Sequence, residues 1–347
     1  MKPTRPAAFA RVALAATEAL FLAAVLAGSG CTTNRSADAI TADSSDAGAA
    51  AEELVIFHAE DLTRPFSALE AILERREPGL DVVRESGSSE MACRKVTDLG
   101  RRADVVAVTD YSLIDQMLIP DLTSWAVTFA RNRIVLLYGE ASRHHTEIGS
   151  DNWFEILLRE DVTYGYADPS IAPVGYRTLL SFRLADIHHG GGDGRLYERL
   201  VRGCPETNIR PHCEQLFPMV QSGSLDYVFH YRSLAAQHHL QYVELAPQVD
   251  LSDPALADQY ARASVEIPGG PGGRPETVTG RPIVYAITIL DDAGNRQAAM
   301  GFLRLLLGSE GRKALEEHLL DLTQPNVTPG SERPPEELAD LIDDTVS

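Results

Sequence analysis

Short apolar runs alternate with helically spaced segments in the first third of the chain. Residues 54–58, 80–83 and 103–108 are apolar runs of the kind found in strands that are buried on both faces. Between them, 65–76 and 90–102 carry apolar residues three to four positions apart, which is the spacing of an amphipathic helix. Strands and helices in this alternation predict an α/β fold with a doubly wound, mainly parallel sheet.

The rest of the chain continues the alternation and predicts a second lobe. Strands are expected at 133–138, 162–167, 225–230, 242–245 and 283–290, and helices at 153–158, 176–187 and 298–318, the last as one long amphipathic helix. We expect 133–138 to cross into the second lobe and 242–245 to return. This division makes 53–132 the first part of lobe 1, 133–240 lobe 2, and 241–347 the completion of lobe 1 with C-terminal helices. The roughly 295 residues after the leader suffice for a core in each lobe.

The first thirty residues have the pattern of an export signal. Three basic residues precede an apolar stretch, and small residues then lead to Cys31. A cysteine at this place predicts a lipoprotein, with Cys31 as the lipid-attachment residue. An ordinary signal peptide with an incidental cysteine is the alternative. The apolar stretch falls short of the ~20 residues that a membrane-spanning helix needs. Residues 31–52 are polar and small without a hydrophobic period, which predicts a disordered tether.

Charge and cysteine content narrow the function further. The formal net charge of −19 argues against nucleic-acid binding, because phosphate contacts need a basic face. In an oxidising compartment Cys204 and Cys213, which flank a short Pro-containing loop, can form a disulfide, and Cys93 is then an odd thiol on a helix. The cysteine spacings match no zinc site, and the glycine-rich stretches lack the spacing of phosphate-binding loops.

Several sequence blocks resemble the tungstate/molybdate-binding lipoproteins of ABC importers. The most specific are Phe57-His58-Ala59, Asp110-Tyr111-Ser112-Leu113-Ile114, Ser150-Asp151-Asn152-Trp153, Gly175-Tyr176-Arg177 and Asp226-Tyr227-Val228-Phe229. The resemblance covers about residues 54–311 and implies a two-lobed type II periplasmic-binding-protein clamshell, each lobe a mainly parallel sheet flanked by helices. It also implies an extracytoplasmic location, an ABC importer permease as partner, an oxyanion ligand and no cofactor. No nucleophile–base signature appears, so we expect no enzyme activity.

The resemblance also points to four ligand-contacting positions, which we compared one at a time. In the family, a serine of the first loop touches the oxyanion; the matching stretch here carries Glu60 and Asp61, and Asp61 is alternatively a helix cap. The serine of the second loop is kept as Ser89, as helix cap, hydroxyl donor or both.

The other two positions carry carboxylates that contact the metal atom in the family, and both are replaced here. One is Ala172, beside which the backbone N–H groups of Gly175 and Tyr176 remain as donors; the other is His230. A histidine with an ordinary pKa near 6.5 donates to an anion when protonated. We therefore expect weakened molybdate binding that improves below pH ~6.5 as His230 protonates.

Three hypotheses remain open from the sequence. The leading one is capture of molybdate, tungstate or a similar tetrahedral oxyanion by an altered pocket. The second is a divalent cation or cationic ligand held by Glu60, Asp61, Glu90 and His230, because carboxylates with an imidazole suit such a metal. The third is a sensory lipoprotein that uses the same two lobes without feeding a transporter.

Overall fold

The computed structural model describes residues 52–211, 213–270 and 274–342. The signal segment and Cys31 lie outside the described residues, as does the tether up to residue 51. No helix in the described part of the chain is long and apolar enough to cross a membrane.

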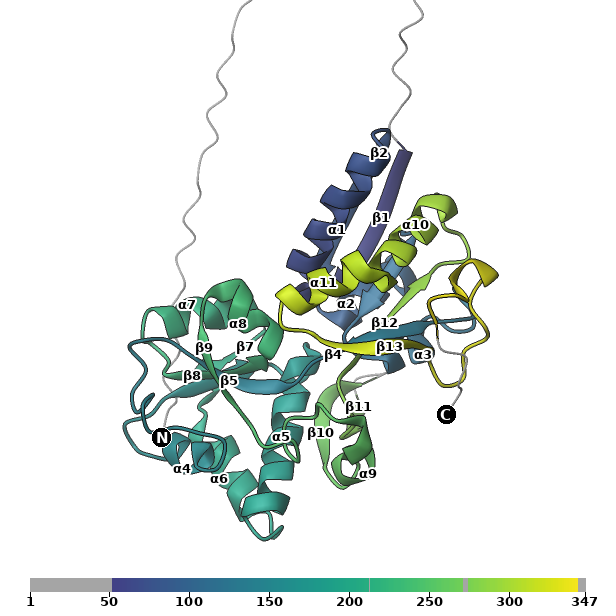
Figure 1. Cartoon of the computed structure of the whole chain (residues 1–347). Helices are drawn as coiled ribbons and strands as arrows, with labels where there is room; N and C mark the ends of the chain where they lie inside the picture. Colours follow the sequence, from purple (N-terminus) through teal and green to yellow (C-terminus); the bar gives the residue numbers. More distant parts are fainter. Residues whose placement is uncertain (1–51, 212, 271–273, 343–347) are drawn as a thin grey trace, which may run out of the picture. The chain divides into compact units, whose positions relative to one another are not determined.

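The first lobe is built on a six-stranded sheet with the order β13-β4-β12-β3-β1-β2 (Figure 1). Its strands are β1 (Glu52–Ala59), β2 (Leu80–Gly87), β3 (Val105–Val108), β4 (Val127–Arg131), β12 (Val284–Ile289) and β13 (Asp321–Val327). Its helices are α1 (Thr63–Arg76), α2 (Ser89–Thr97), α3 (Tyr111–Met117), α10 (Arg296–Leu307) and α11 (Ser309–Glu317), with the short 3₁₀ turns η1 (Glu60–Leu62) and η6 (Glu336–Leu338).

Both faces of this sheet are covered, because successive side chains of a strand point to opposite sides. Ile56 of β1 packs in the cluster that contains Phe66 of α1 and Phe302 of α10. The next residue, Phe57, packs in a separate cluster with Cys93 of α2. Burial on both faces explains why β1 and β3 read as continuous apolar runs.

The second lobe is built on a five-stranded sheet with the order β7-β6-β8-β5-β9. Its strands are β5 (Ile134–Tyr138), β6 (Tyr164–Ala167), β7 (Ile209–Arg210), β8 (Tyr227–Tyr231) and β9 (Gln241–Glu244). Its helices are α4 (Trp153–Leu157), α5 (Pro173–His189), α6 (Arg195–Gly203), α7 (Leu216–Gln221) and α8 (Arg232–His238), with the turns η2 (Glu206–Asn208) and η3 (Cys213–Gln215). Phe229 centres the core, its ring 4.9 Å from Phe182 and 5.6 Å from Trp153 between centroids.

In each sheet, the first strand after the chain changes lobe runs against its neighbours. β5 is antiparallel to β8 and β9, and β12 is antiparallel to β3 and β4. The strands β1, β2 and β3 pair in parallel, as do β6, β7 and β8. The predicted two-lobed α/β fold is thus confirmed, with reversed strands in each sheet: β5 in the second lobe, and β12 and β13 in the first, where β13 is also antiparallel to β4.

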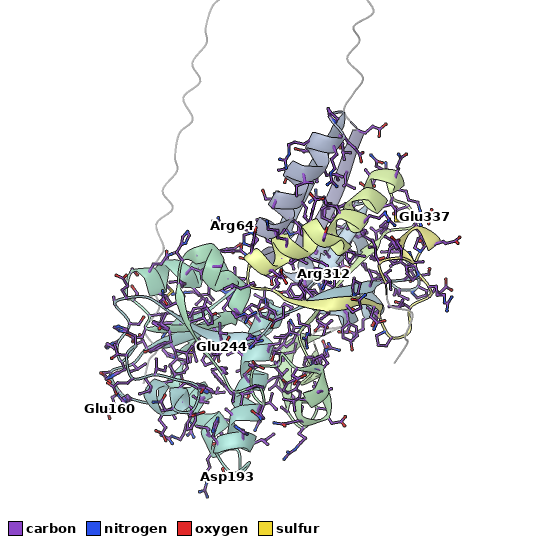
Figure 2. The ribbon with its side chains drawn as sticks, viewed as in Figure 1. Arg64, Glu160, Asp193, Glu244, Arg312 and Glu337 are labelled. Carbon is purple, nitrogen blue, oxygen red and sulfur yellow. The ribbon has the colours of Figure 1, made fainter. Side chains whose placement is uncertain are left out.

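Two chain crossings connect the lobes. The first lies between β4 and β5, and the second follows β9, continues through η4 (Pro254–Leu256), α9 (Ala257–Tyr260) and the antiparallel pair β10 (Ser264–Gly270) and β11 (Arg274–Thr279), and ends at β12. The crossings are tied together, because Ile134 N–H donates to the carbonyl of Asp250 at 2.9 Å. Glu244, labelled in Figure 2, lies 3.6 Å from Arg232 and 3.7 Å from Arg133.

The single helix predicted over 298–318 is wrong. It is two helices, α10 and α11, separated by Gly308, whose ψ of −179° is extended rather than helical. A Cβ on Gly311 would lie 2.2 Å from the carbonyl oxygen of Leu306, so α11 turns back tightly on the end of α10. The amphipathic spacing continues through the break, which hid it in the sequence.

The predicted Cys204–Cys213 disulfide is not formed in this structure. Cys204 is a free, buried cysteine whose thiol donates to the carbonyl of Tyr164 at 3.4 Å. Its side chain is thus directed into the buried core beside β6. The side chain of Cys213 is outside the described part of the structure. Cys93 is buried on α2, as predicted.

Candidate functional site

A small cavity lies between the lobes, where strands end and helices begin. Its volume is ≈ 30 Å³. It is lined by Ala59, Glu60, Asp61, Gly87, Ser88, Ser89, Thr109, Ala172, Pro173, Val174, His230 and Tyr231. In open α/β sheets, ligands bind at the carboxyl ends of the strands, and β1, β2, β3 and β8 all end here. Pockets for drug-sized ligands run to roughly 300–1,000 Å³, so this cavity suits a ligand of few atoms.

Two hydroxyl residues at the start of α2 contribute to the cavity wall. Ser88 is the helix cap, and its Oγ accepts from Met91 N–H at 3.2 Å. Ser89 was predicted as the cap; instead its Oγ accepts from Thr109 N–H at 2.9 Å and shares a 3.0 Å hydrogen bond with Thr109 Oγ1. The N-cap is therefore Ser88 and not Ser89, and Ser89 joins the loop after β2 to the loop after β3.

The start of α5 forms the wall contributed by lobe 2. Ala172 is its N-cap and offers no side-chain hydrogen bond, and Pro173 follows in the first turn. Pro173 has no N–H, and the N–H of Val174 has no partner within the helix because it lies in the first turn. The positive end of this 17-residue helix therefore faces the cavity, where it favours negative charge.

The two α5 residues that we predicted as backbone donors lie outside the cavity lining. The N–H of Gly175 donates to the carbonyl of Ala172 at 2.9 Å. A Cβ on Gly175 would lie 2.4 Å from the carbonyl oxygen of Ala167, so this glycine serves close packing between α5 and β6. Tyr176 turns toward lobe 1, where its hydroxyl donates to Asp110 at 3.0 Å.

Asp61 is buried and does not cap a helix. The N-cap of α1 is Leu62, without a side-chain hydrogen bond, so the capping alternative is wrong. The Asp61 carboxylate instead accepts a short hydrogen bond from the hydroxyl of Tyr285, and that hydroxyl accepts from Asn132 at 2.7 Å. Burial raises the pKa of Asp61 to about 6, against the opposing effects of the Tyr285 hydrogen bond and the Arg177 charge. The carboxyl is therefore ionised at neutral pH and titrates in mildly acidic solution.

His230 lines the cavity, and its ring carries a buried, unpartnered hydrogen-bond donor. Its Nδ1 accepts from the N–H of Tyr231 at 2.8 Å, so the proton of the neutral ring is on Nε2. Nε2 is buried and has no hydrogen-bond partner among the described residues. Burial lowers the pKa of His230 to about 3. The expectation that this histidine becomes charged near pH 6.5 is therefore wrong, because the imidazolium would have to form inside the protein with no compensating partner.

A buried arginine from lobe 2 lies against this site and reaches lobe 1. Arg177 of α5 donates to the Tyr231 hydroxyl at 2.6 Å and to the Thr109 carbonyl at 3.1 Å. It also pairs with Asp110 at 3.0 Å, and Arg281 pairs with the same carboxylate at 3.1 Å. Burial opposes the charge of Asp110, but the two arginines outweigh it and hold the pKa of Asp110 below its usual value.

The network carries one more positive than negative charge. Two arginines share a single carboxylate, and Thr109 and Tyr231, which Arg177 contacts, both line the cavity. An anion in the cavity would thus lie near the positive charge of Arg177, but also beside the carboxylates of Asp61 and Glu60, which line the cavity and oppose it. Other contacts also join the lobes: Arg64, labelled in Figure 2, donates from α1 to the carbonyl of Gln237 in α8 at 3.3 Å.

The structure therefore brings together five of the seven predicted ligand-contacting residues. These are Glu60, Asp61, Ser89, Ala172 and His230. The sequence analysis missed Thr109 and Tyr231. It named Arg177 only as part of the Gly175-Tyr176-Arg177 block that resembles the family. Thr109 follows the strand 105–108 and precedes the helix that Asp110 caps, which is the same kind of strand-to-helix junction as the other loops. This position at a strand-to-helix junction is the feature of the sequence that could have identified Thr109 as a cavity residue.

The four residues of the cation hypothesis do not converge. Glu90 is absent from the cavity lining and pairs with Arg94 at 2.7 Å. In the described ranges, no three histidine, cysteine, aspartate or glutamate side chains lie together as a metal site. The start of α5 and the charge of Arg177 favour an anion, whereas Asp61 and Glu60, which line the cavity, oppose a fully deprotonated one.

Comparison with known proteins gives consistent matches. Residues 54–318 match the family of bacterial extracellular solute-binding proteins. An uncharacterized solute-binding protein of Petrotoga mobilis is 43% identical over 294 residues, covering 84% of this chain and 90% of the relative. The molybdate/tungstate-binding protein WtpA of Pyrococcus abyssi is 38% identical over 327 residues, covering 86% of this chain and 92% of the relative.

A solved structure shows the same fold at low sequence identity. The periplasmic molybdate-binding protein of Azotobacter vinelandii superposes with a TM-score of 0.52 and is 17% identical. The match covers 78% of this chain and all of that one (100%). This likeness concerns the arrangement of the two lobes, and it is independent of which residues line the cavity.

Proposed function

Because the chain belongs to the bacterial extracellular solute-binding protein family, we propose that it captures a small tetrahedral oxyanion for an ABC importer. The observation that carries the proposal is the unpartnered, buried Nε2–H of His230, a residue that lines a cavity of ≈ 30 Å³. An unsatisfied buried donor costs roughly 1–3 kcal/mol, which an anionic ligand would recover by accepting its hydrogen bond. Molybdate and tungstate are the reference ligands, by resemblance to the relatives that bind them.

Two groups add to the attraction of an anion. The N-terminus of α5 and the buried Arg177 both supply positive charge, and hydroxyls of Ser88, Thr109 and Tyr231 supply further donors. Where the family has two carboxylates that contact the metal atom, this chain has Ala172 and His230. The anion would therefore be held through its oxygens alone, which makes molybdate binding weaker than in a carboxylate-bearing relative.

Calorimetric titration of the purified protein with molybdate, tungstate and sulfate tests the proposal. His230→Phe should weaken binding of every anion by about tenfold or more, because it removes the donor, whereas His230→Gln keeps an N–H and should lose less. Elemental analysis of the protein purified from its own membrane, for molybdenum, tungsten and divalent metals, checks the ligand class. Binding of a divalent cation in place of any oxyanion would refute the proposal.

We also propose that the mature protein is held at the extracytoplasmic face of a membrane through a lipid on Cys31. The support is the order of basic, apolar and small residues that ends at this cysteine. Wild type and Cys31→Ser should both be exported, and only wild type should partition into the detergent phase. Equal partitioning of the two proteins would refute the anchor and favour an ordinary signal peptide.

A further inference from the structure

The residues that line the cavity carry a hydrogen-bond acceptor, the Asp61 carboxylate, as well as donors. A fully deprotonated anion has no proton to donate to that acceptor. We propose that the cavity selects a tetrahedral oxyanion that carries a proton, such as hydrogen phosphate or hydrogen arsenate, with Asp61 accepting from the ligand hydroxyl and His230 donating to an unprotonated oxygen. This inference rests on the proposed function and specifies its ligand.

The acceptor is held in place by the fold. Asp61 is 3% exposed and lies in the turn between β1 and α1. Its side chain is anchored by the Tyr285 hydroxyl of β12, and its backbone carbonyl accepts from Gln237 at 2.8 Å. Because its side chain and its backbone are both hydrogen-bonded, the Asp61 carboxylate is not free to turn into solvent when an anion binds. A carboxylate offers about four lone-pair sites, and the Tyr285 hydroxyl occupies one of them.

The donor lies on the opposite lobe. His230 is 3% exposed, and its Nδ1 is occupied by the Tyr231 N–H, which leaves Nε2–H as the donor. The same ring cannot accept a proton from the ligand at neutral pH, since its accepting nitrogen is already used. One wall of the cavity thus donates and another accepts. A ligand that satisfies both must have a bare oxygen and a hydroxyl.

Ligand chemistry then separates the candidates. Asp61 stands where the family has the serine that touches the oxyanion, and not where the family's carboxylates contact the metal atom. Sulfate, molybdate and tungstate carry no proton at neutral pH, so their oxygens present only acceptors to the Asp61 carboxylate and are repelled by it. Phosphate and arsenate carry at least one proton and can donate to that carboxylate. Hydrogen bonds to charged groups are worth about 1.5–3 kcal/mol, which corresponds to roughly tenfold to a hundredfold in affinity.

Two ligands of nearly the same shape test the selection for a protonated oxyanion on the wild-type protein. Hydrogen phosphate and monofluorophosphate are both tetrahedral dianions, and they differ by one hydroxyl in place of one fluorine. Titrations of the full mature chain at about pH 7.5 keep Asp61 ionised, because burial sets its pKa at about 6. Hydrogen phosphate should bind at least about tenfold more tightly than monofluorophosphate or sulfate, and hydrogen arsenate should behave like hydrogen phosphate.

The variant Asp61→Asn tests whether the Asp61 carboxylate is the group that selects for a protonated ligand. The asparagine keeps an acceptor for Tyr285 and loses the negative charge, so sulfate and molybdate should gain about tenfold or more while the preference for hydrogen phosphate collapses. Asp258→Asn, at an exposed carboxylate of α9, is the matched control and should leave all affinities unchanged. Thermal melts of both variants check that they are folded.

The possible outcomes distinguish selection by the ligand proton from oxyanion capture itself. Equal or tighter binding of sulfate, molybdate or monofluorophosphate by wild type would overturn the selection by proton while leaving oxyanion capture intact. Retention of the hydrogen phosphate preference in folded Asp61→Asn would also overturn it. If none of these anions binds, the proposed function itself fails.

Discussion

The pH dependence of molybdate binding depends on the titration of Asp61. Its pKa is raised to about 6 by burial, so the carboxyl is charged above that pH and neutral below it. His230 remains neutral throughout this range because burial lowers its pKa to about 3. Tyr231 remains protonated because burial raises its pKa to about 12, and Arg177 stays charged. Glu60 is the other carboxylate at the cavity. Molybdate affinity should therefore rise as the pH falls through about 6.

The size of the effect follows from Coulomb's law. One pair of like charges about 6 Å apart repels by about 3 kcal/mol at an effective dielectric near 20, which is roughly two decades in Kd. A dianion at that distance is repelled about twice as strongly, and counter-charge from Arg177 offsets part of it. Between about pH 8 and pH 5.5 we expect affinity to increase tenfold to a hundredfold.

Calorimetry can detect the proton directly. Above pH 6, binding a dianion should draw a proton onto Asp61, so the apparent enthalpy should vary with the ionisation enthalpy of the buffer. Near pH 7 we expect uptake approaching one proton in wild type and close to none in Asp61→Asn, whose affinity should be nearly independent of pH. Binding by wild type without proton uptake, or the same pH profile in Asp61→Asn, would refute the reasoning.

The same titration affects the unliganded protein, with a defined sign. Because burial raises the pKa of Asp61 in the folded protein, its charged form destabilises the folded state relative to the unfolded state. The free energy of unfolding therefore falls as the pH rises from about 4 through 6. A pKa moved from 3.8 to about 6 corresponds to roughly 3 kcal/mol at pH 8. Asp61→Asn should therefore raise the melting temperature of the unliganded protein at pH 8, and the increase should shrink at pH 4.

Four further outcomes follow from the packing. Arg177→Met should lower the free energy of unfolding by about 3 kcal/mol, since it leaves a buried carboxylate short of one partner, whereas exposed Arg202→Met should change it by under about 1 kcal/mol in denaturant titrations. Gly175→Ala should cost about 1–3 kcal/mol through backbone overlap, and Gly79→Ala, with open space around it, should cost little. The Cys204 thiol, whose pKa burial raises to about 12, should react with alkylating reagents only after unfolding. X-ray scattering should show a smaller radius of gyration with a proven ligand, because closure of the lobes assembles the cavity; unchanged scattering would contradict this.

Much of the fold was readable from local pattern. Strands with both faces buried, such as β1 and β3, appear as apolar runs because every residue of a run needs an apolar side chain. Elements with weaker patterns were missed. The strand β11 is mostly exposed over 275–279, and β10 alternates over only five described residues, 264–268. The strand β4 directly precedes β5, so its apolar residues were not separated from the next run. The break at Gly308 leaves the helical period intact and is visible only in the backbone.

Site positions were predictable to the extent that they follow strand ends. Glu60, Asp61, Ser89, Ala172 and His230 occupy junctions that sequence comparison can align, and all of them line one cavity. Gly175 and Tyr176 belong to the same helix start, but the helical rotation of about 100° per residue carries them to other faces. Arg177, which adds the buried positive charge, lies still further along α5 and reaches the site only because the lobes meet there.

The sequence by itself determined the class of protein, most of the order of strands and helices, and which residue types stand at the ligand-contacting loops, because these depend on local composition and spacing. Only the tertiary structure decided what those residues do. Burial moves the pKa of Asp61 up to about 6 and that of His230 down to about 3, and these shifts depend on neighbours that are far away in the chain. Tyr285 is 224 positions from Asp61, and Arg177 is 68 from Thr109. A charge state is a property of the surrounding dielectric and partners, so it appears only when the chain is folded.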